Sequence, residues 1–246
     1  MKACFFDVDG TLLPKYHRQI PGETVDALER LRRNGHKVVL CTGRGSEELD
    51  FTDFRFDGYI LLNGQLCLDE KMETYFENPI TGEDLTELIR LFRDKKVPIV
   101  LTERNRVYMN FHNDYVRDVS EEISIAPHPV AEYKGGVIYM ATVYAQEKMK
   151  VGSLRADRWH EWAFDAYPDG GGKANGMREF CRKHRIRIED TIAFGDAEND
   201  IEMNKSAGFG VAMGNGYDSV KAVADFVTDD ANKGGVRAAL KAMAMI

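Results

Sequence analysis

Several features that mark particular classes of protein are scarce in this sequence. Only four of its 246 residues are cysteine, and no Cys-x-x-Cys spacing occurs among Cys4, Cys41, Cys67 and Cys181. Metal-binding or disulfide roles are therefore not predicted for them. No apolar run approaches the ~18 residues of a membrane-spanning helix. Met1-Lys2 leads directly into a strand pattern, with no signal-peptide pattern before it. We therefore expect a cytoplasmic protein without a membrane partner.

Basic residues are also too few and too dispersed for a nucleic-acid surface. The 33 Lys and Arg residues face 40 Asp and Glu, which gives a formal net charge of −7. A nucleic-acid footprint needs clustered Lys and Arg, and no such run is present. The six histidines show no metal-ligand spacing. We expect no nucleic-acid partner and a monomer or weak homo-oligomer.

The two ends of the chain alternate strand and helix patterns. The first third predicts a strand at Ala3–Phe6, a helix at Thr24–Asn34, and strands at Lys37–Cys41 and Gly58–Leu62. The last third predicts helices at 174–183, 199–207, 217–224 and from 235 onward, with strands at 191–194, 210–213 and 225–228. This alternation is typical of a parallel sheet with helical crossovers.

The middle third predicts a different architecture. Helices are expected at 84–93 and 114–123, and strands at 97–101, 107–111, 137–144 and 159–166. Strands joined by short turns favour an antiparallel sheet. Pro79 and Pro168 mark the edges. We therefore expect an α/β fold with a Rossmann-like parallel-sheet core, residues 1–79 and 168–246, interrupted by an inserted α+β domain, residues 80–167, with an antiparallel sheet.

The segment Cys4-Phe5-Phe6-Asp7-Val8-Asp9-Gly10-Thr11 is the most informative of the chain. It reads as a buried strand that ends in two carboxylates. Two carboxylates this close cannot both be ionised in a dry pocket without a cation or a shared proton. An Asp-x-Asp-Gly turn without further function is the alternative.

Three more polar clusters follow strands or begin a helix. Thr42-Gly43-Arg44 follows one strand, Gly195–Asp200 follows another, and Gly170-Gly171-Gly172 leads to Lys173 at a helix start. Because the carboxyl ends of parallel strands meet at one edge of a sheet, these clusters are expected to converge. Carboxylates for Mg²⁺ together with hydroxyl, amide and ammonium donors suit phosphoryl transfer.

The chain resembles the haloacid dehalogenase (HAD) superfamily phosphatases of the Cof type, which carry a large inserted cap. Four motifs occur in the family's order: DVDGT at Asp7–Thr11, TGR at Thr42–Arg44, Lys173, and GDAEND at Gly195–Asp200. The tail GFGVAMGNGYDSVKAVADFVTDD is also similar to that group. One departure is that Ala174, rather than glycine, follows the lysine, which puts the helix entry in question.

The resemblance implies a role for each matching residue. Asp7 would be the nucleophile, and Asp9 the general acid and base. Mg²⁺ would be held by Asp7, the Asp9 carbonyl and Asp196, with Asp200 steadying this shell. Phosphate would be bound by Thr42, Gly43, Lys173 and Asn199.

Each of these residues also has a simpler interpretation. Lys173 could lie in a solvated loop, Asn199 and Asp200 could cap a helix, and Thr42 could only turn the chain. Arg44 could contact substrate or form a surface ion pair.

The inserted domain is expected to close over the site as a lid. Its segment Arg158–Asp165 is rich in side chains that could bind a sugar, notably Trp159, His160 and Trp162, or that could be core aromatics of a strand. The resemblance thus implies a magnesium-dependent phosphatase that hydrolyses a small phosphate ester, most plausibly a sugar phosphate, through an aspartyl-phosphate. A phosphosugar mutase and a non-catalytic protein that binds phosphorylated ligands are the alternatives.

Overall fold

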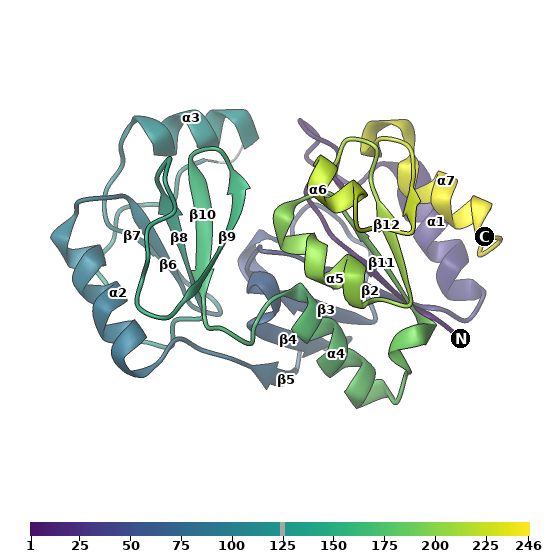
Figure 1. The fold of residues 1–246 in the computed structure, drawn as a ribbon, viewed down its shortest axis with the longest axis horizontal. Helices are drawn as coiled ribbons and strands as arrows, with labels where there is room; N and C mark the ends of the chain where they lie inside the picture. Colours follow the sequence, from purple (N-terminus) through teal and green to yellow (C-terminus); the bar gives the residue numbers. More distant parts are fainter. Residues whose placement is uncertain (124–125) are drawn as a thin grey trace.

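The chain forms two lobes, each built around its own β-sheet (Figure 1). The computed structural model describes residues 1–123 and 126–246. The core lobe contains an eight-stranded sheet in the order β13-β12-β11-β1-β2-β3-β4-β5, and the inserted lobe a five-stranded sheet in the order β7-β6-β8-β10-β9. This arrangement confirms the expected α/β core and the separate antiparallel sheet. Among the described residues, no helix has the length and apolar character required to span a membrane.

The core sheet is parallel from β13 to β3 and continues into two antiparallel strands at one edge. Its strands are β1 (Ala3–Phe6), β2 (Lys37–Cys41), β3 (Gly58–Leu61), β4 (Leu66–Asp69), β5 (Thr74–Glu77), β11 (Thr191–Gly195), β12 (Phe209–Ala212) and β13 (Phe226–Val227). Its helices are α1 (Gly22–Arg33), α4 (Lys173–His184), α5 (Ile201–Ser206), α6 (Asp218–Lys221) and α7 (Gly235–Ala242). The sequence pattern does not predict β4 and β5, because the apolar run of β4 spans only Leu66–Leu68 and β5 has half-buried residues between exposed ones.

The inserted lobe consists of α2 (Gly82–Asp94), β6 (Ile99–Thr102), β7 (Val107–Met109), α3 (Asp114–Ile123), β8 (Met140–Tyr144), β9 (Arg155–His160) and β10 (Ala163–Tyr167). The prediction of one strand over 159–166 is wrong, because the chain turns at Glu161–Trp162 and forms the hairpin of β9 and β10. The turn lacks the Gly, Pro or Asn signals of most hairpins. His160 Nδ1 instead accepts a hydrogen bond from the Trp162 N–H at 3.1 Å.

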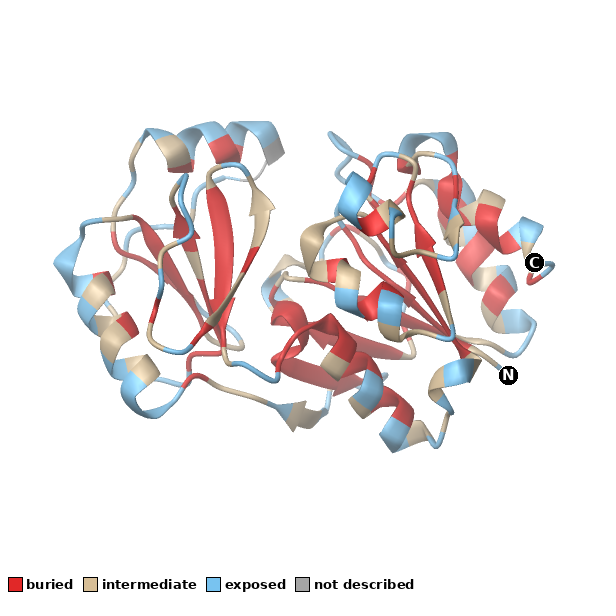
Figure 2. Cartoon of the chain, viewed as in Figure 1, coloured by how far each residue is buried: buried red, intermediate tan, exposed pale blue. Residues whose placement is uncertain are grey.

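The central strands of the core are buried on both faces (Figure 2). Phe6 lies in the cluster that includes α1 and α7, whereas Phe5 lies in the cluster that includes α4 and α5. The Phe5 ring meets Phe180 edge-on, with ring centroids 5.5 Å apart. A continuous apolar run is therefore required here, since a parallel sheet covered by helices leaves neither face of β1 in water.

Helix α4 packs unusually close to β3 at Gly176. A Cβ added at Gly176 would overlap the side chain of Ile60 and lie 3.3 Å from Cys67 Sγ. The glycine therefore sets the distance between this helix and the sheet, and with it the position of Lys173 at the helix start.

We expect Gly176→Ala to destabilise the protein by about 1–3 kcal/mol, because overpacking outweighs the gain of about 1 kcal/mol in helix propensity. Gly22→Ala in α1 is the matched control, since nothing lies within 4 Å of its added Cβ. Chemical denaturation of both variants measures the difference. A Gly176→Ala protein as stable as the Gly22→Ala protein would contradict this packing role.

Candidate active site

The polar clusters meet where the strand order reverses. β1 lies between β2 and β11, and all three run parallel. Asp7 follows β1, Thr42 follows β2, and Asp196 follows β11. These residues therefore lie at the same edge of the sheet, in the crevice where open α/β sheets bind their ligands.

Three carboxylates and one ammonium form the centre of this crevice. Oxygen atoms of Asp7, Asp196 and Asp200 lie within 4.8 Å of one another. Lys173 Nζ donates to Asp7 Oδ1 at 2.6 Å and to Asp200 Oδ1 at 2.7 Å. The side chain of Lys173 is 1% exposed, so the alternative of a solvated loop is wrong. Helix α4 begins at Lys173 although alanine follows it.

Crowding and burial shift the protonation equilibria of this cluster. Burial, with added repulsion from Asp200 and Asp9, raises the pKa of Asp7 from 3.8 to about 7 although Lys173 opposes the shift. Burial and repulsion from Asp7 and Asp200 likewise raise the pKa of Asp196 well above its usual value. Burial alone would lower the pKa of Lys173, but Asp200 and Asp7 outweigh it and raise this pKa. The Lys173 ammonium therefore stays charged, and its single positive charge is not enough to balance three ionised carboxylates.

Asp200 has two roles at once. Its Oδ2 accepts hydrogen bonds from the N–H groups of Asp196 at 2.9 Å and Ala197 at 3.1 Å, while Oδ1 contacts Lys173. Asp200 thus closes the short turn of residues 198–200, but it makes no side-chain cap hydrogen bond at the start of α5, so the capping alternative holds only for that turn. The turn that follows β1 passes close to Asp196 at Gly10. This glycine has φ +82°, and a Cβ added to it would overlap the Asp196 carboxylate.

Arg44 holds the Asp9 carboxylate in a two-point ion pair. Its Nε and Nη2 donate to Asp9 Oδ2 at 2.9 Å and Oδ1 at 2.6 Å. The Arg44 side chain is only 14% exposed and lies over the Phe51 ring, whereas Asp9 is 59% exposed. Arg44 therefore orients the residue expected to be the general acid.

The expected phosphate ligands surround this cluster, together with one residue that the sequence motifs missed. Thr42 Oγ1 accepts the Arg44 N–H at 3.1 Å, so the hydroxyl does turn the chain while its own hydrogen stays free to donate. Asn199 Nδ2 donates to Asn63 Oδ1 at 3.0 Å. The missed residue is Asn63, whose N–H donates to the Thr42 carbonyl at 3.0 Å. Its signal was a polar Asn-Gly pair after β3, a further strand that ends at this edge.

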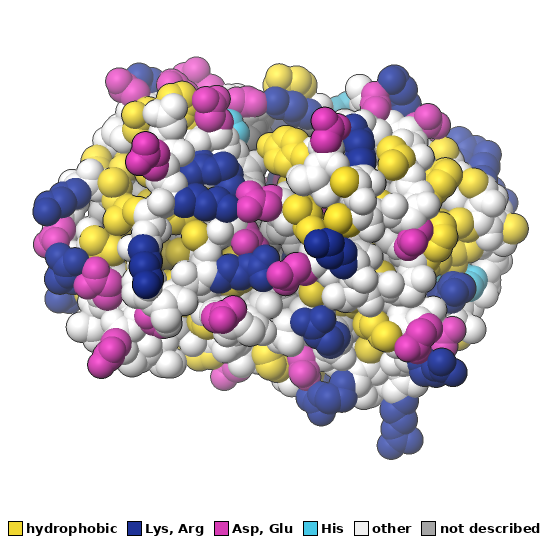
Figure 3. Space-filling view, in the orientation of Figure 1, with side chains coloured by type: hydrophobic (Ala, Val, Ile, Leu, Met, Phe, Trp, Pro, Cys, Tyr) yellow, Lys and Arg dark blue, Asp and Glu magenta, His cyan; other side chains and the backbone are white. Residues whose placement is uncertain are grey.

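Charged side chains of both signs meet along the boundary between the lobes (Figure 3), whereas the aromatic side chains of Arg158–Asp165 make their contacts within the inserted lobe. Trp159 Nε1 donates to Asp165 Oδ1 at 3.1 Å, and Trp162 stacks on Tyr115. His160 Nε2 lies 3.0 Å from Glu122 Oε2. These contacts fit the core-aromatic interpretation of the segment Arg158–Asp165.

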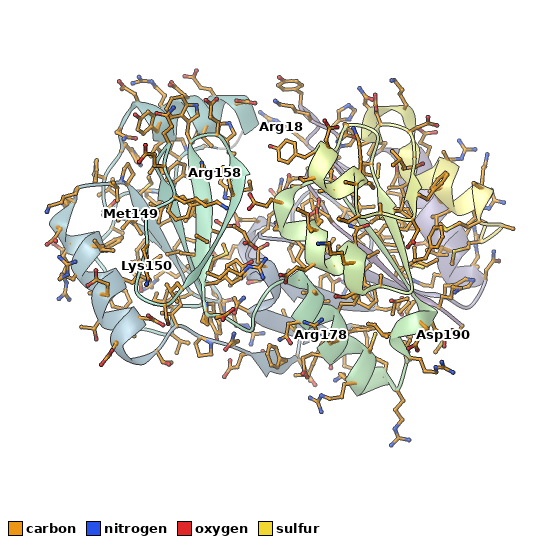
Figure 4. All side chains as sticks on the ribbon, viewed as in Figure 1. Arg18, Met149, Lys150, Arg158, Arg178 and Asp190 are labelled. Atoms are coloured by element: carbon orange, nitrogen blue, oxygen red, sulfur yellow. The ribbon has the colours of Figure 1, made fainter. Side chains whose placement is uncertain are left out.

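Arg158, labelled on β9 in Figure 4, binds main-chain oxygens of the inserted lobe. It donates to the carbonyls of Gln146 at 2.9 Å and His160 at 3.0 Å. Its role is therefore to tie the segment after β8 to the hairpin.

Comparison with known proteins agrees with this geometry. The family model for haloacid dehalogenase-like hydrolases matches residues 4–240. YkrA of Bacillus subtilis is 30% identical over 274 residues, covering 100% of this chain and 98% of YkrA. The 5-amino-6-(5-phospho-D-ribitylamino)uracil phosphatase YitU of the same organism is 28% identical, covering 96% of this chain and 94% of YitU. The structure of the HAD subclass IIB sugar phosphatase BT4131 is similar over the full length of both chains, with a TM-score of 0.90 and 28% identity. The chain therefore belongs to the haloacid dehalogenase-like hydrolases and is an enzyme of the phosphatase type.

Proposed function

We propose that this enzyme is a magnesium-dependent phosphatase that hydrolyses a small phosphorylated metabolite, a sugar phosphate, through an aspartyl-phosphate on Asp7. The observation that carries this proposal is the buried cluster of Asp7, Asp196 and Asp200 around Lys173. When all three carboxylates are ionised, one ammonium leaves two negative charges uncompensated, which a divalent cation would balance.

The donor set fits Mg²⁺. The available atoms are carboxylate and carbonyl oxygens, which this hard cation prefers, and its strict geometry suits a few protein ligands with waters. We assign Asp7, the Asp9 carbonyl and Asp196 as ligands and Asp200 as the residue that orients them. When bound, the ion supplies charge neutralisation for the phosphate oxygens.

The chain's own groups supply the remaining chemistry. Asp7 attacks the phosphorus and forms the acyl phosphate, which splits one displacement into two. Lys173, Thr42, the Gly43 amide and Asn199 hold the phosphate oxygens in position.

Asp9 gives a proton to the leaving oxygen and later takes one from the attacking water. This role requires Asp9 to exchange the guanidinium of Arg44 for the substrate oxygen.

The inserted lobe is proposed to act as a lid, with domain boundaries after residues 79 and 167. Among the described residues, the pairs Lys148–Glu198, Arg155–Glu202 and Lys15–Glu122 join the two lobes, and His128 Nε2 lies 3.9 Å from Glu48 Oε1. A closed lid excludes water from the acyl phosphate and contacts the leaving group. BT4131 is named a sugar phosphatase and YitU a 5-amino-6-(5-phospho-D-ribitylamino)uracil phosphatase, which supports a polyhydroxylated leaving group here. The cytoplasmic location and the monomeric or weakly oligomeric state stay predictions.

We expect the protein with Mg²⁺ to release one inorganic phosphate for each sugar phosphate consumed. A panel of phosphate esters assayed for free phosphate and for sugar products measures this. Formation of an isomeric phosphosugar without free phosphate would instead support a mutase. A folded protein that binds the esters and leaves them unchanged would support the non-catalytic alternative.

The Asp7→Asn substitution should lower kcat on any ester of the panel by at least ~10³-fold, because an amide cannot form the acyl phosphate. Asp69→Asn provides a control, since Asp69 is a largely buried carboxylate paired with Lys183 outside the site and its variant should retain activity. Turnover by Asp7→Asn at the wild-type rate would refute the nucleophile assignment.

The raised pKa of Asp7 predicts how stability depends on pH and metal. Without metal, folded Asp7 holds its proton up to about pH 7, whereas the unfolded group loses it near 3.8. Stability from this group is therefore full below pH 4 and is lost as the pH rises through 7.

Saturating Mg²⁺ should offset that loss and raise Tm by roughly 5–10 °C at pH 8, with a smaller rise at pH 5.5, where protons compete for the same oxygens. Thermal unfolding with Mg²⁺ or EDTA measures both shifts. Asp196→Asn should abolish most of the Mg²⁺ effect. A Tm and an activity that do not respond to EDTA would exclude the metal site.

A further inference from the structure

Asp165 is a carboxylate of the inserted lobe that is buried against the core. It lies on β10 and is 4% exposed. Its Oδ1 accepts from Thr142 Oγ1 at 2.7 Å and from Trp159 Nε1 at 3.1 Å, both on neighbouring strands of the same lobe. Its Oδ2 accepts from Asn63 Nδ2 at 2.9 Å, which is a contact across the two lobes. One carboxylate therefore joins the lid sheet to the segment after β3.

This contact fixes the direction of a chain of hydrogen bonds. Burial raises the pKa of Asp165 to about 7, although the hydrogen bonds from Thr142, Trp159 and Asn63 oppose this shift. Above that pH the ionised carboxylate can only accept, so Asn63 turns its NH₂ group towards Asp165. Asn63 Oδ1 then faces the other way and accepts from Asn199 Nδ2 at 3.0 Å. The amide of Asn199 is thereby oriented as well. Among the described residues, its Oδ1 is buried without a partner.

The chain of side chains passes beside the proposed phosphate site. A Cβ added at Gly43 would lie 3.4 Å from Asn63 Nδ2 and 3.4 Å from Asp165 Oδ2. Asn63 itself has left-handed backbone angles, φ 52° and ψ 40°, which asparagine tolerates better than most residues. Gly64, next to it, packs against Gly172, which precedes Lys173. Asn63 thus lies between three segments that carry proposed phosphate ligands, those of Gly43, Lys173 and Asn199.

We propose that Asp165 is a positioning residue for phosphoryl transfer: its carboxylate orients Asn63 and, through Asn63, the Asn199 amide at the phosphate site. This inference rests on the proposed function. Under this inference the lid has a second role besides covering the substrate. The phosphate site of the core is correctly oriented only when β10 of the lid lies against Asn63. One amide hydrogen of Asn199 is used by Asn63, and the other is left in a fixed direction for the ester.

The isosteric substitution Asp165→Asn tests whether the direction of the hydrogen bonds between Asp165, Asn63 and Asn199 matters for activity. Whichever way the new amide turns, its NH₂ group faces a donor, either Asn63 Nδ2 or Trp159 Nε1. We expect kcat/KM to fall about 10- to 100-fold, and the inhibition constant for inorganic phosphate to rise, since a misoriented Asn199 holds phosphate less well. Asn63→Asp alone should also lose activity, because two carboxylates then face each other.

The double variant Asp165→Asn with Asn63→Asp is the decisive measurement. The carboxylate at position 63 would accept from both the amide at position 165 and Asn199. The hydrogen bond between positions 165 and 63 is then restored with its direction reversed, and the bond from Asn199 keeps its direction. We expect kcat/KM and the phosphate inhibition constant to return to within about threefold of wild type.

Thr142→Val is the matched control, because it removes a donor from Asp165 Oδ1 and leaves the contact with Asn63 intact. It should keep kcat/KM within about threefold of wild type. The Tm of each variant, measured alongside, separates folding from positioning.

Two results would overturn the inference while leaving the proposed function intact. One is wild-type kcat/KM in folded Asp165→Asn. The other is a double variant that regains Tm but not kcat/KM. By contrast, a wild-type enzyme that releases no phosphate from any ester would refute the proposed function itself.

Discussion

The structure depends on how charge is balanced at the carboxyl edge of the core sheet. Asp7, Asp196 and Asp200 are brought within 4.8 Å of one another in a largely buried site, and Lys173 supplies only one positive charge. Carboxylates in this setting must take up protons or a cation. The protein tolerates an unfavourable local arrangement that a divalent ion and a phosphate ester would complete, which is the pattern expected where binding and catalysis take place.

Topology explains why these four groups meet. Asp7 and Asp196 follow adjacent parallel strands, so their convergence needs no special loop. Lys173 arrives from the first residue of α4, whose close packing at Gly176 fixes its depth. The inserted lobe contributes Asp165, whose hydrogen bond with Asn63 links this lobe to the same edge of the core sheet. Residues from both sheets therefore surround the site, although the charged cluster itself lies in the core lobe.

The part of the fold and the site that could be predicted from sequence is the part that is encoded locally. β1 was recognisable as an apolar run that ends at Asp7, and the rule that the carboxyl ends of parallel strands share one edge brought Thr42 and Asp196 to the same crevice. The hairpin of β9 and β10 was not predicted, because its turn uses a histidine side chain in place of a glycine or asparagine signal. The pairing of Asn63 with Asp165 joins residues 102 positions apart across two lobes, and no spacing rule reveals such a contact.

The central claim is that Asp7 and Asp196 hold one divalent ion at the mouth of the sheet. Anomalous diffraction from crystals soaked with Mn²⁺ in place of Mg²⁺ tests it most directly, because the metal position is then seen rather than inferred. We expect one strong peak within roughly 2.5 Å of carboxylate oxygens of Asp7 and Asp196 and of the Asp9 carbonyl. A peak elsewhere on the molecule, with none between these residues, would contradict the account.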